Sequence, residues 1–139
     1  MLDETPSRRR VVSPPVLILE DDMIRAGEKL AEIEDLGLGG KIMTRRSALD
    51  GPPPSEAFSL AILSVKSLQP DELRVPEALR RHRPELPLLL ICDAKDPGTA
   101  PWPKCTVIPK KGSLKQLRGR VADILGIVLS DEPGTTLKS

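Results

Sequence analysis

Five polar residues of this 139-residue chain follow short apolar segments: Glu20, Asp21, Ser64, Cys92 and Lys110. A serine hydroxyl becomes a nucleophile only when a base or a metal ion activates it, and Glu20 or Asp21 could act as that base. The thiol of Cys92 could respond to oxidants, although a buried thiol at the end of a strand is usually inert. Any such chemistry depends on the elements that bring these side chains together.

Unbroken apolar runs in the chain predict strands that are buried on both faces of a sheet. The clearest runs cover residues 16–19, 60–63 and 88–91, and weaker strands are expected at 41–44 and 105–108. Helical patterns fall between the strands, from residue 23 to about 36, over 71–83 and over 113–128. Gly37 is expected to end the first of these helices, and Ser113 is expected to cap the last. The second helix is expected to open at Pro76, as its first residue.

Two further helices that the alternation requires are interrupted by proline and glycine. Gly51 and the three prolines that follow it limit residues 45–57 to one or two helical turns. Residues 93–104 hold three prolines and a glycine, which exclude a full helix.

Strands that alternate with helices predict an α/β fold with a parallel sheet covered on both faces. Five strands and right-handed crossovers favour a flavodoxin-like (βα)5 three-layer sandwich, with strand order 2-1-3-4-5 and with the second and fourth helices short or missing. Sites in such sheets form beyond the carboxyl ends of the strands. The five polar residues are therefore expected to gather at one edge of the sheet.

Composition indicates one domain, at residues 15–129, between disordered tails at 1–14 and 130–139. The net charge of +1 provides no general field to attract nucleic acid or an anionic membrane. No segment approaches the ~20 apolar residues that cross a bilayer. Two cysteines and the lack of a signal peptide favour a cytoplasmic, reduced protein.

The segments VLILEDD (16–22) and VIPKKGSLKQL (107–117) carry a family resemblance. Over about residues 15–128 the chain resembles the receiver domain of bacterial two-component response regulators. Its layout is most similar to small alphaproteobacterial stand-alone receivers, in which the fourth helix is commonly reduced.

The resemblance implies a role for each of the five polar residues. Glu20 and Asp21 match the acid pair that helps to hold Mg²⁺. Ser64 occupies the position of the aspartate that accepts the phosphoryl group, Cys92 that of a serine or threonine that binds the phosphate, and Lys110 that of the lysine that pairs with the phosphoryl oxygens.

Several departures from the family pattern accompany Ser64. Val107 stands where the family has an aromatic switch residue, and Lys111 stands where proline usually follows the lysine. Because a Mg²⁺ site needs carboxylates, the loss of the aspartate weakens the metal site, and we expect no cofactor beyond weak Mg²⁺ at Glu20 and Asp21. Our hypothesis is that Lys66, together with Lys110, neutralises these acids in place of the metal; the alternative is that Lys66 points to water.

Other interpretations of the same residues stay open at this point. The acids at 20–22 could cap the first helix. Trp102 could anchor a partner or cover the sheet where the fourth helix is missing. His82 and the arginines around it indicate an exposed, solvated helix end.

The leading interpretation is an atypical receiver-like domain of two-component (phosphorelay) signalling that lacks the phospho-accepting aspartate. It would be no enzyme and would act by binding another signalling protein or a second copy, through a face that includes Trp102, Val107 and Leu117. The alternative is a working receiver that is phosphorylated at Ser64 or a nearby acid.

Two further classes are disfavoured. Near-neutral charge, few aromatic residues and the lack of a helix-turn-helix argue against a nucleic-acid module that uses Arg8–Arg10. The lack of a GxSxG segment and of a histidine near Ser64 argues against a hydrolase.

Overall fold

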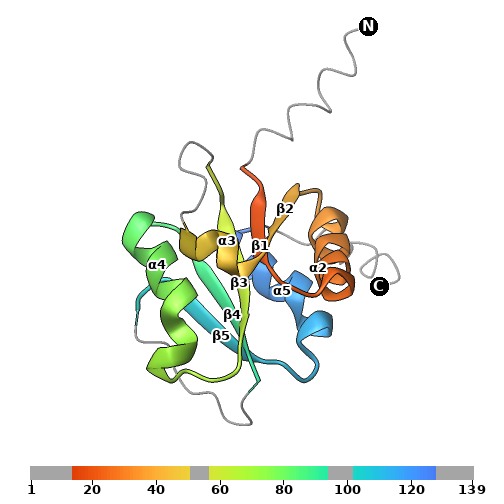
Figure 1. Cartoon of the computed structure of the whole chain (residues 1–139). Coiled ribbons are helices and arrows are strands. Elements are labelled where there is room, and N and C mark those ends of the chain that lie inside the picture. Colours follow the sequence, from red (N-terminus) through yellow and green to blue (C-terminus); the bar gives the residue numbers. More distant parts are fainter. Residues whose placement is uncertain (1–13, 51–56, 94–101, 128–139) are drawn as a thin grey trace, which may run out of the picture.

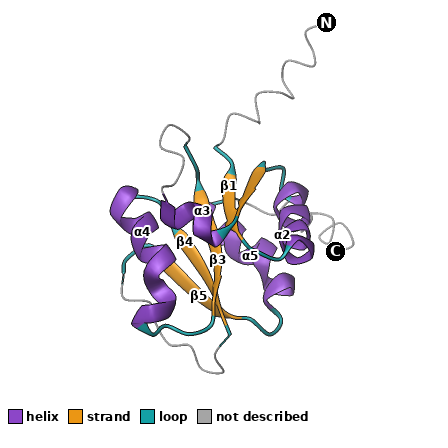
Figure 2. Cartoon of the chain, in the orientation of Figure 1, coloured by secondary structure: helices purple, strands orange, loops and turns teal. Residues whose placement is uncertain are grey.

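The computed structural model describes residues 14–50, 57–93 and 102–127. These residues form a five-stranded parallel sheet between two layers of helices, as Figure 1 and Figure 2 show. The strand order is β2-β1-β3-β4-β5, which confirms the predicted flavodoxin-like α/β fold. The strands are β1 (Val16–Leu19), β2 (Gly40–Met43), β3 (Leu60–Val65), β4 (Leu88–Cys92) and β5 (Cys105–Pro109).

The three central strands are buried on both faces because both alternating sets of their side chains are apolar. Two of the strands differ from the prediction. β3 continues through Ser64 to Val65, so the serine lies within the strand and not beyond it. β2 starts one residue earlier than expected, at Gly40.

The helices divide between the two faces of the sheet. On one face lie α2 (Met23–Asp35) and α5 (Ser113–Leu125), and on the other lie α3 (Arg45–Asp50) and α4 (Arg74–His82), which the short 3-10 helix η2 (Pro70–Leu73) precedes. Each face has its own core. The core on the α2 and α5 face includes Ile18, Ile33 and Val121, and the core on the α4 face includes Leu19 and Leu79. The sheet is thus the middle layer of three, as predicted.

The helix ends follow local chemistry. Asp22 caps α2, since its carboxylate accepts from the N–H groups of Ile24 and Arg25. Gly37 follows the helix with a φ of +84°, a left-handed conformation that suits glycine. The predicted cap at Ser113 is wrong: Gly112 is the cap residue, with a φ of +75°, and Ser113 is already helical.

The second helix is short, as the proline pattern predicts: α3 has six residues. The third helix, α4, has nine residues and was not predicted to be short. The predicted opening at Pro76 is wrong: α4 starts at Arg74, so Pro76 is its third residue. A proline is tolerated there because an N–H group in the first turn has no acceptor within the helix. The interruption expected at 93–104 lies mostly outside the described residues.

The basic end of α4 is only partly solvated. Arg81 and His82 are exposed, as expected. Arg80 is instead half-buried, and its guanidinium donates to the carbonyl oxygens of Pro84 and Pro103 at 2.6 and 2.8 Å. This side chain thereby ties α4 to the segment that enters β5.

The regular elements span residues 16–125, and most of the predicted tails at 1–14 and 130–139 falls outside the described residues. No helix in the described part of the chain has the length and apolarity needed to cross a bilayer.

Two isoleucines of α2 provide a matched test of this core. Ile33 is fully buried, whereas Ile24 is 77% exposed. Ile33→Ala should lower the free energy of unfolding by about 2–5 kcal/mol, since it leaves a cavity. Ile24→Ala should change it by less than about 0.5 kcal/mol. Urea denaturation followed by circular dichroism measures both, and similar losses from the two variants would contradict the burial of this helix face.

Candidate functional site

Sheet register places Glu20 and Ser64 side by side. β1 and β3 are parallel neighbours with Leu19 opposite Leu63, so the next residue of each chain segment lies at the same level. Leu19 and Leu63 belong to the core on the α4 face, and side chains alternate along a strand. Glu20 and Ser64 therefore point to the other face, toward α2.

Lys29 of α2 meets these two side chains. Its ammonium donates to Glu20 Oε1 at 2.5 Å and to Ser64 Oγ at 3.0 Å. Ser64 Oγ also lies 3.4 Å from the same carboxylate oxygen, to which it can donate. The side chains of Lys29 and Glu20 are each only 9% exposed, so this is a buried ion pair.

The sequence analysis missed Lys29, although a signal was present. Lys29 stands three residues after Ala26 and four before Ile33, on the buried stripe of the helix. A lysine on such a stripe requires a buried partner for its charge. Glu20, at the end of the preceding strand, is that partner.

The three successive acids have three different roles. Glu20 Oε2 accepts from the N–H of Asp22 at 3.2 Å, so both of its oxygens are engaged. Asp22 caps α2, which confirms the capping interpretation for this acid alone. Asp21 is exposed and accepts from the N–H of Arg45 at 2.9 Å.

Arg45 is a second residue that the sequence analysis missed. Its guanidinium donates to the carbonyl oxygen of Ser64 at 3.1 Å and lies 4.0 Å from the carboxylate of Asp21. Arg45 thus links α3 to the end of β3 and engages Asp21.

The residues present do not fit the Mg²⁺ that the resemblance implies. A divalent cation needs several oxygen ligands that converge on one point, but an ammonium already occupies Glu20 Oε1 and Ser64 Oγ. Asp21 is engaged by Arg45. Among the described residues, no group of three or more His, Cys, Asp or Glu side chains could hold a metal ion.

The hypothesis that assigned this neutralisation to Lys66 is wrong in its geometry. Lys66 is exposed, and its backbone N–H lies 3.4 Å from Glu72 Oε1. β3 runs one residue past Ser64, and the chain then turns toward η2, away from Glu20. The cation beside Glu20 comes from α2 instead.

Lys110 and Cys92 lie at the expected edge of the sheet. Lys110 follows β5, and its ammonium is 3.8 Å from Asp93 Oδ2, a loose and exposed pair. Cys92 ends β4 opposite Pro109 and is fully buried. Its thiol is therefore packed in the core on the α4 face, not presented to the site.

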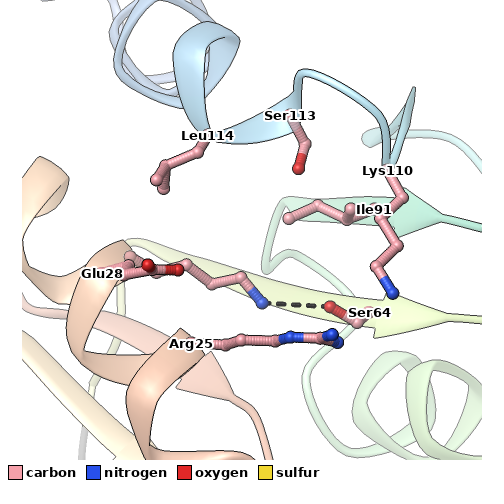
Figure 3. Close-up of a pocket in the computed structure, with 8 residues that line it drawn as sticks. Arg25, Glu28, Ser64, Ile91, Lys110, Ser113 and Leu114 are labelled. Carbon is pink, nitrogen blue, oxygen red and sulfur yellow. Dashed lines mark hydrogen bonds between the residues drawn. The ribbon is translucent and has the colours of Figure 1, made fainter.

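A hollow of about 170 Å³ opens beside Ser64, between the starts of α2 and α5. Figure 3 shows Arg25 and Lys110 extending toward Ser64 from opposite sides, with Leu114 above Glu28 at the other end. An external group could approach Ser64 through this hollow.

Ser64 is not arranged as a nucleophile. Lys29 acts as a donor to its hydroxyl oxygen, and a donor cannot take the proton that an attacking serine must lose. The possible acceptor, Glu20, is already held by Lys29 at the shorter distance of 2.5 Å. The geometry favours a structural hydrogen bond over catalysis.

The three residues predicted for a partner face do not share one surface. Trp102 and Val107 are partly buried against the core on the α4 face, which favours a covering role for the tryptophan. Leu117 is fully buried in the core on the opposite face. Its inclusion in a partner face is wrong, since no partner can reach it.

Both cysteines are free. Because β4 and β5 are parallel, Cys92 and Cys105 lie at opposite ends of neighbouring strands, as the sequence analysis expected. Burial raises the pKa of the Cys105 thiol to about 11, although the Arg80 guanidinium acts in the opposite direction.

Comparisons with solved structures identify the fold. A response regulator receiver protein from Sinorhizobium medicae is 18% identical, with a TM-score of 0.65, over 83% of this chain and 96% of that one. A response regulator receiver protein from Burkholderia phymatum is 19% identical, with a TM-score of 0.62, over 85% and 99%. HP1043, an orphan response regulator of H. pylori, is 16% identical, with a TM-score of 0.57, over 83% and 98%. The chain therefore adopts the fold of response regulator receiver domains.

Sequence comparisons add nothing to this result. No family model matches the chain, and no curated protein does.

Removal of Lys29 should destabilise the fold. Lys29→Met leaves Glu20 buried without its cation, which should lower the free energy of unfolding by about 3–5 kcal/mol. Lys115→Met, at an exposed position of α5, is the matched control and should change it by less than about 0.5 kcal/mol. Adding Glu20→Gln to Lys29→Met should recover part of the loss. Equal losses from both lysine variants in urea denaturation would refute the buried pair.

Thiol reactivity checks the burial of Cys105. Because the thiolate is the reactive form, iodoacetamide at about pH 8 should modify Cys105 more than about tenfold more slowly in the folded chain than in urea. The rate in the folded chain should increase as the pH rises toward 11, the raised pKa of this thiol. Peptide mass spectrometry separates Cys105 from Cys92, and a folded-state rate equal to that in urea would contradict the prediction.

Proposed function

We propose that this chain is an atypical receiver-like domain of two-component signal transduction that works by protein–protein interaction, without phosphoryl transfer. The observation that carries the proposal is the ammonium of Lys29, bonded to both Glu20 and Ser64. A built-in cation occupies the acid that a regulatory metal would use, and a hydroxyl stands in place of the acceptor carboxylate. The partner would be another signalling protein or a second copy.

A lysine differs from a bound metal because it does not dissociate. Phosphorylation-dependent switching requires a site whose charge changes when a ligand arrives or leaves. Here the cation is covalently part of α2, so its charge stays in the site at all times. This arrangement supports a domain with a single stable conformation that is recognised as a fixed surface.

The competing function, phosphorylation at Ser64 or a nearby acid, has no comparable support. Ser64 receives a hydrogen bond from Lys29, and Asp21 is bonded to the N–H of Arg45. The phosphodonor experiment below distinguishes the two functions directly.

Phosphodonors should leave the chain unchanged. Incubation with acetyl phosphate and Mg²⁺ should give no increase in intact mass, and beryllofluoride with Mg²⁺ should give no shifts in the amide NMR spectrum. The reason is the lack of an activated acceptor and of a free metal site. A stoichiometric phosphoryl adduct would overturn the proposal.

Two variants make this test specific to Lys29. Ser64→Asp alone should still bind Mg²⁺ poorly, because the Lys29 ammonium stays between the two carboxylates and repels a divalent cation. Ser64→Asp combined with Lys29→Ala should gain Mg²⁺ binding, measured by NMR titration, because the carboxylates of Glu20 and of the introduced aspartate then lie side by side without an internal cation. If Ser64→Asp alone binds Mg²⁺ as well as the double variant, the lysine is not the block.

A further inference from the structure

β5 is the strand of the sheet that is held least firmly by its own side chains. It lies at the edge, with β4 as its neighbour on one side (Figure 1), and Ile108 is the one residue of the strand that is buried. At its start, the carbonyl oxygen of Lys104 accepts from the N–H of Leu88 at 2.9 Å. Segments with few buried apolar contacts are the first to open locally, so the contacts at this start decide how firmly β5 stays in place.

The guanidinium of Arg80, on α4, gathers carbonyl oxygens from the two segments that lead into β4 and β5. One of its nitrogens donates to Pro84, in the connection before β4, at 2.6 Å. The other donates to Pro103 at 2.8 Å and to Lys104 at 3.2 Å, just before β5. A guanidinium can hold three acceptors because it has five N–H donors in a fixed plane. Arg80 therefore fastens the start of β5 to α4.

The backbone of Lys104 is strained at the point that Arg80 holds. Its φ is +56°, and in the part of the chain that the structure describes no other residue besides glycine has a positive φ. A side chain with a Cβ atom makes this left-handed conformation unfavourable, and it persists only where the surroundings enforce it. The carbonyl oxygen of Lys104 is bonded to both Leu88 and Arg80, and these two contacts enforce it here.

The side chain of Lys104 provides a third contact, which is weaker. Its ammonium lies 2.5 Å from Glu85 Oε1, but the two side chains are 52% and 86% exposed. Water screens an exposed ion pair, so this pair adds little to the stability of the closed arrangement. The bonds from Arg80 are thus the main side-chain restraint at the start of β5.

The closed arrangement has a second unfavourable feature besides the strain. The Nε atom of Arg80 is buried and has no hydrogen-bond partner among the described residues. A buried donor without an acceptor loses the hydrogen bond that it would make with water. The strain at Lys104 and the unpaired donor of Arg80 are both relieved when the start of β5 moves away, so the geometry is poised for local opening.

We propose that Arg80, Glu85 and Lys104 form a latch that controls local opening of the start of β5 and, with it, access to the Cys105 thiol. Cys105 follows Lys104 directly and packs partly buried against the core on the α4 face. The closed latch shields the thiol. In the open state Lys104 relaxes, Arg80 returns to water and Cys105 becomes accessible, while the other four strands stay paired.

This latch goes beyond the proposed function and is independent of it. The strands are parallel, so the start of β5 lies at the opposite edge of the sheet from the ends of the strands, where Glu20 and Ser64 meet Lys29. The phosphodonor experiment does not involve these residues.

Alkylation of Cys105 by iodoacetamide in the folded chain at about pH 8, followed by peptide mass spectrometry, tests the latch. Arg80→Met should raise the rate about tenfold or more, because the start of β5 then opens more often. Arg81→Met, at an exposed position one residue further along α4, is the matched control and should leave the rate unchanged.

The direction of the change separates a latch from a purely electrostatic role. The Arg80 guanidinium lowers the pKa of the Cys105 thiol, in opposition to burial. Loss of this charge without opening would raise the pKa further and slow alkylation, since the thiolate is the reactive form. Arg80→Lys keeps the charge but cannot span three carbonyl oxygens, so it should also speed alkylation, by less than Arg80→Met. A rate that falls or stays the same in Arg80→Met would overturn the proposal.

Amide hydrogen exchange measured by NMR shows whether the opening is local. In Arg80→Met the N–H of Leu88, which donates to Lys104, should exchange about tenfold faster than in the unmodified chain. The N–H of Glu20 donates to Met43 at the other side of the sheet and should keep its rate. Equal acceleration at both amides would mean that the whole domain unfolds and would refute a latch at β5.

Discussion

Lys29 and Glu20 hold opposite charges at the carboxyl edge of the sheet, where their side chains are each 9% exposed. Moving either charge out of water costs several kcal/mol, and their attraction offsets that cost only when the remaining hydrogen-bonding groups also find partners. Glu20 satisfies this condition with the N–H of Asp22, and Lys29 satisfies it with Ser64. The position of α2 relative to β1 and β3 depends on this set of contacts, because a shift of the helix would separate a buried ammonium from both of its acceptors.

The neighbouring polar groups take positions that leave this pair undisturbed. Asp22 caps the helix that carries Lys29, and Asp21 faces outward to Arg45. If Asp21 also pointed at Glu20, two carboxylates would compete for one ammonium. Asp21 is instead bonded to Arg45, whose second contact, with the Ser64 carbonyl oxygen, joins α3 to the same strand end. Helices on both faces of the sheet are thus connected through one edge.

The order of the sheet could be predicted because apolar runs and alternating helices leave few topologies for a chain of this size. The edge at which Glu20, Ser64 and Lys110 gather followed from that topology. Lys66 was chosen because it is near Ser64 in sequence, but a strand that continues and then turns carries its next residues away. Lys29 is far from Ser64 in sequence but lies beside it in space, because α2 packs over the sheet face to which Ser64 points. Leu117 was assigned to a surface although it stands at the centre of the apolar stripe of α5, a position that predicts burial.

Ser64 and Lys29 are complementary in a way that explains why serine suits this position. An aspartate there would place a second carboxylate beside Glu20, and a single ammonium would leave one negative charge buried without compensation. A hydroxyl is neutral, accepts from Lys29 and can donate to Glu20, so the charges of the cluster balance. Conversely, a site that binds a divalent cation needs the second carboxylate as a ligand, and an ammonium at the same place would repel the cation. A hydroxyl at position 64 and an ammonium at position 29 therefore disfavour a divalent cation together more strongly than either would alone, because the first withholds a carboxylate and the second occupies the oxygens that remain.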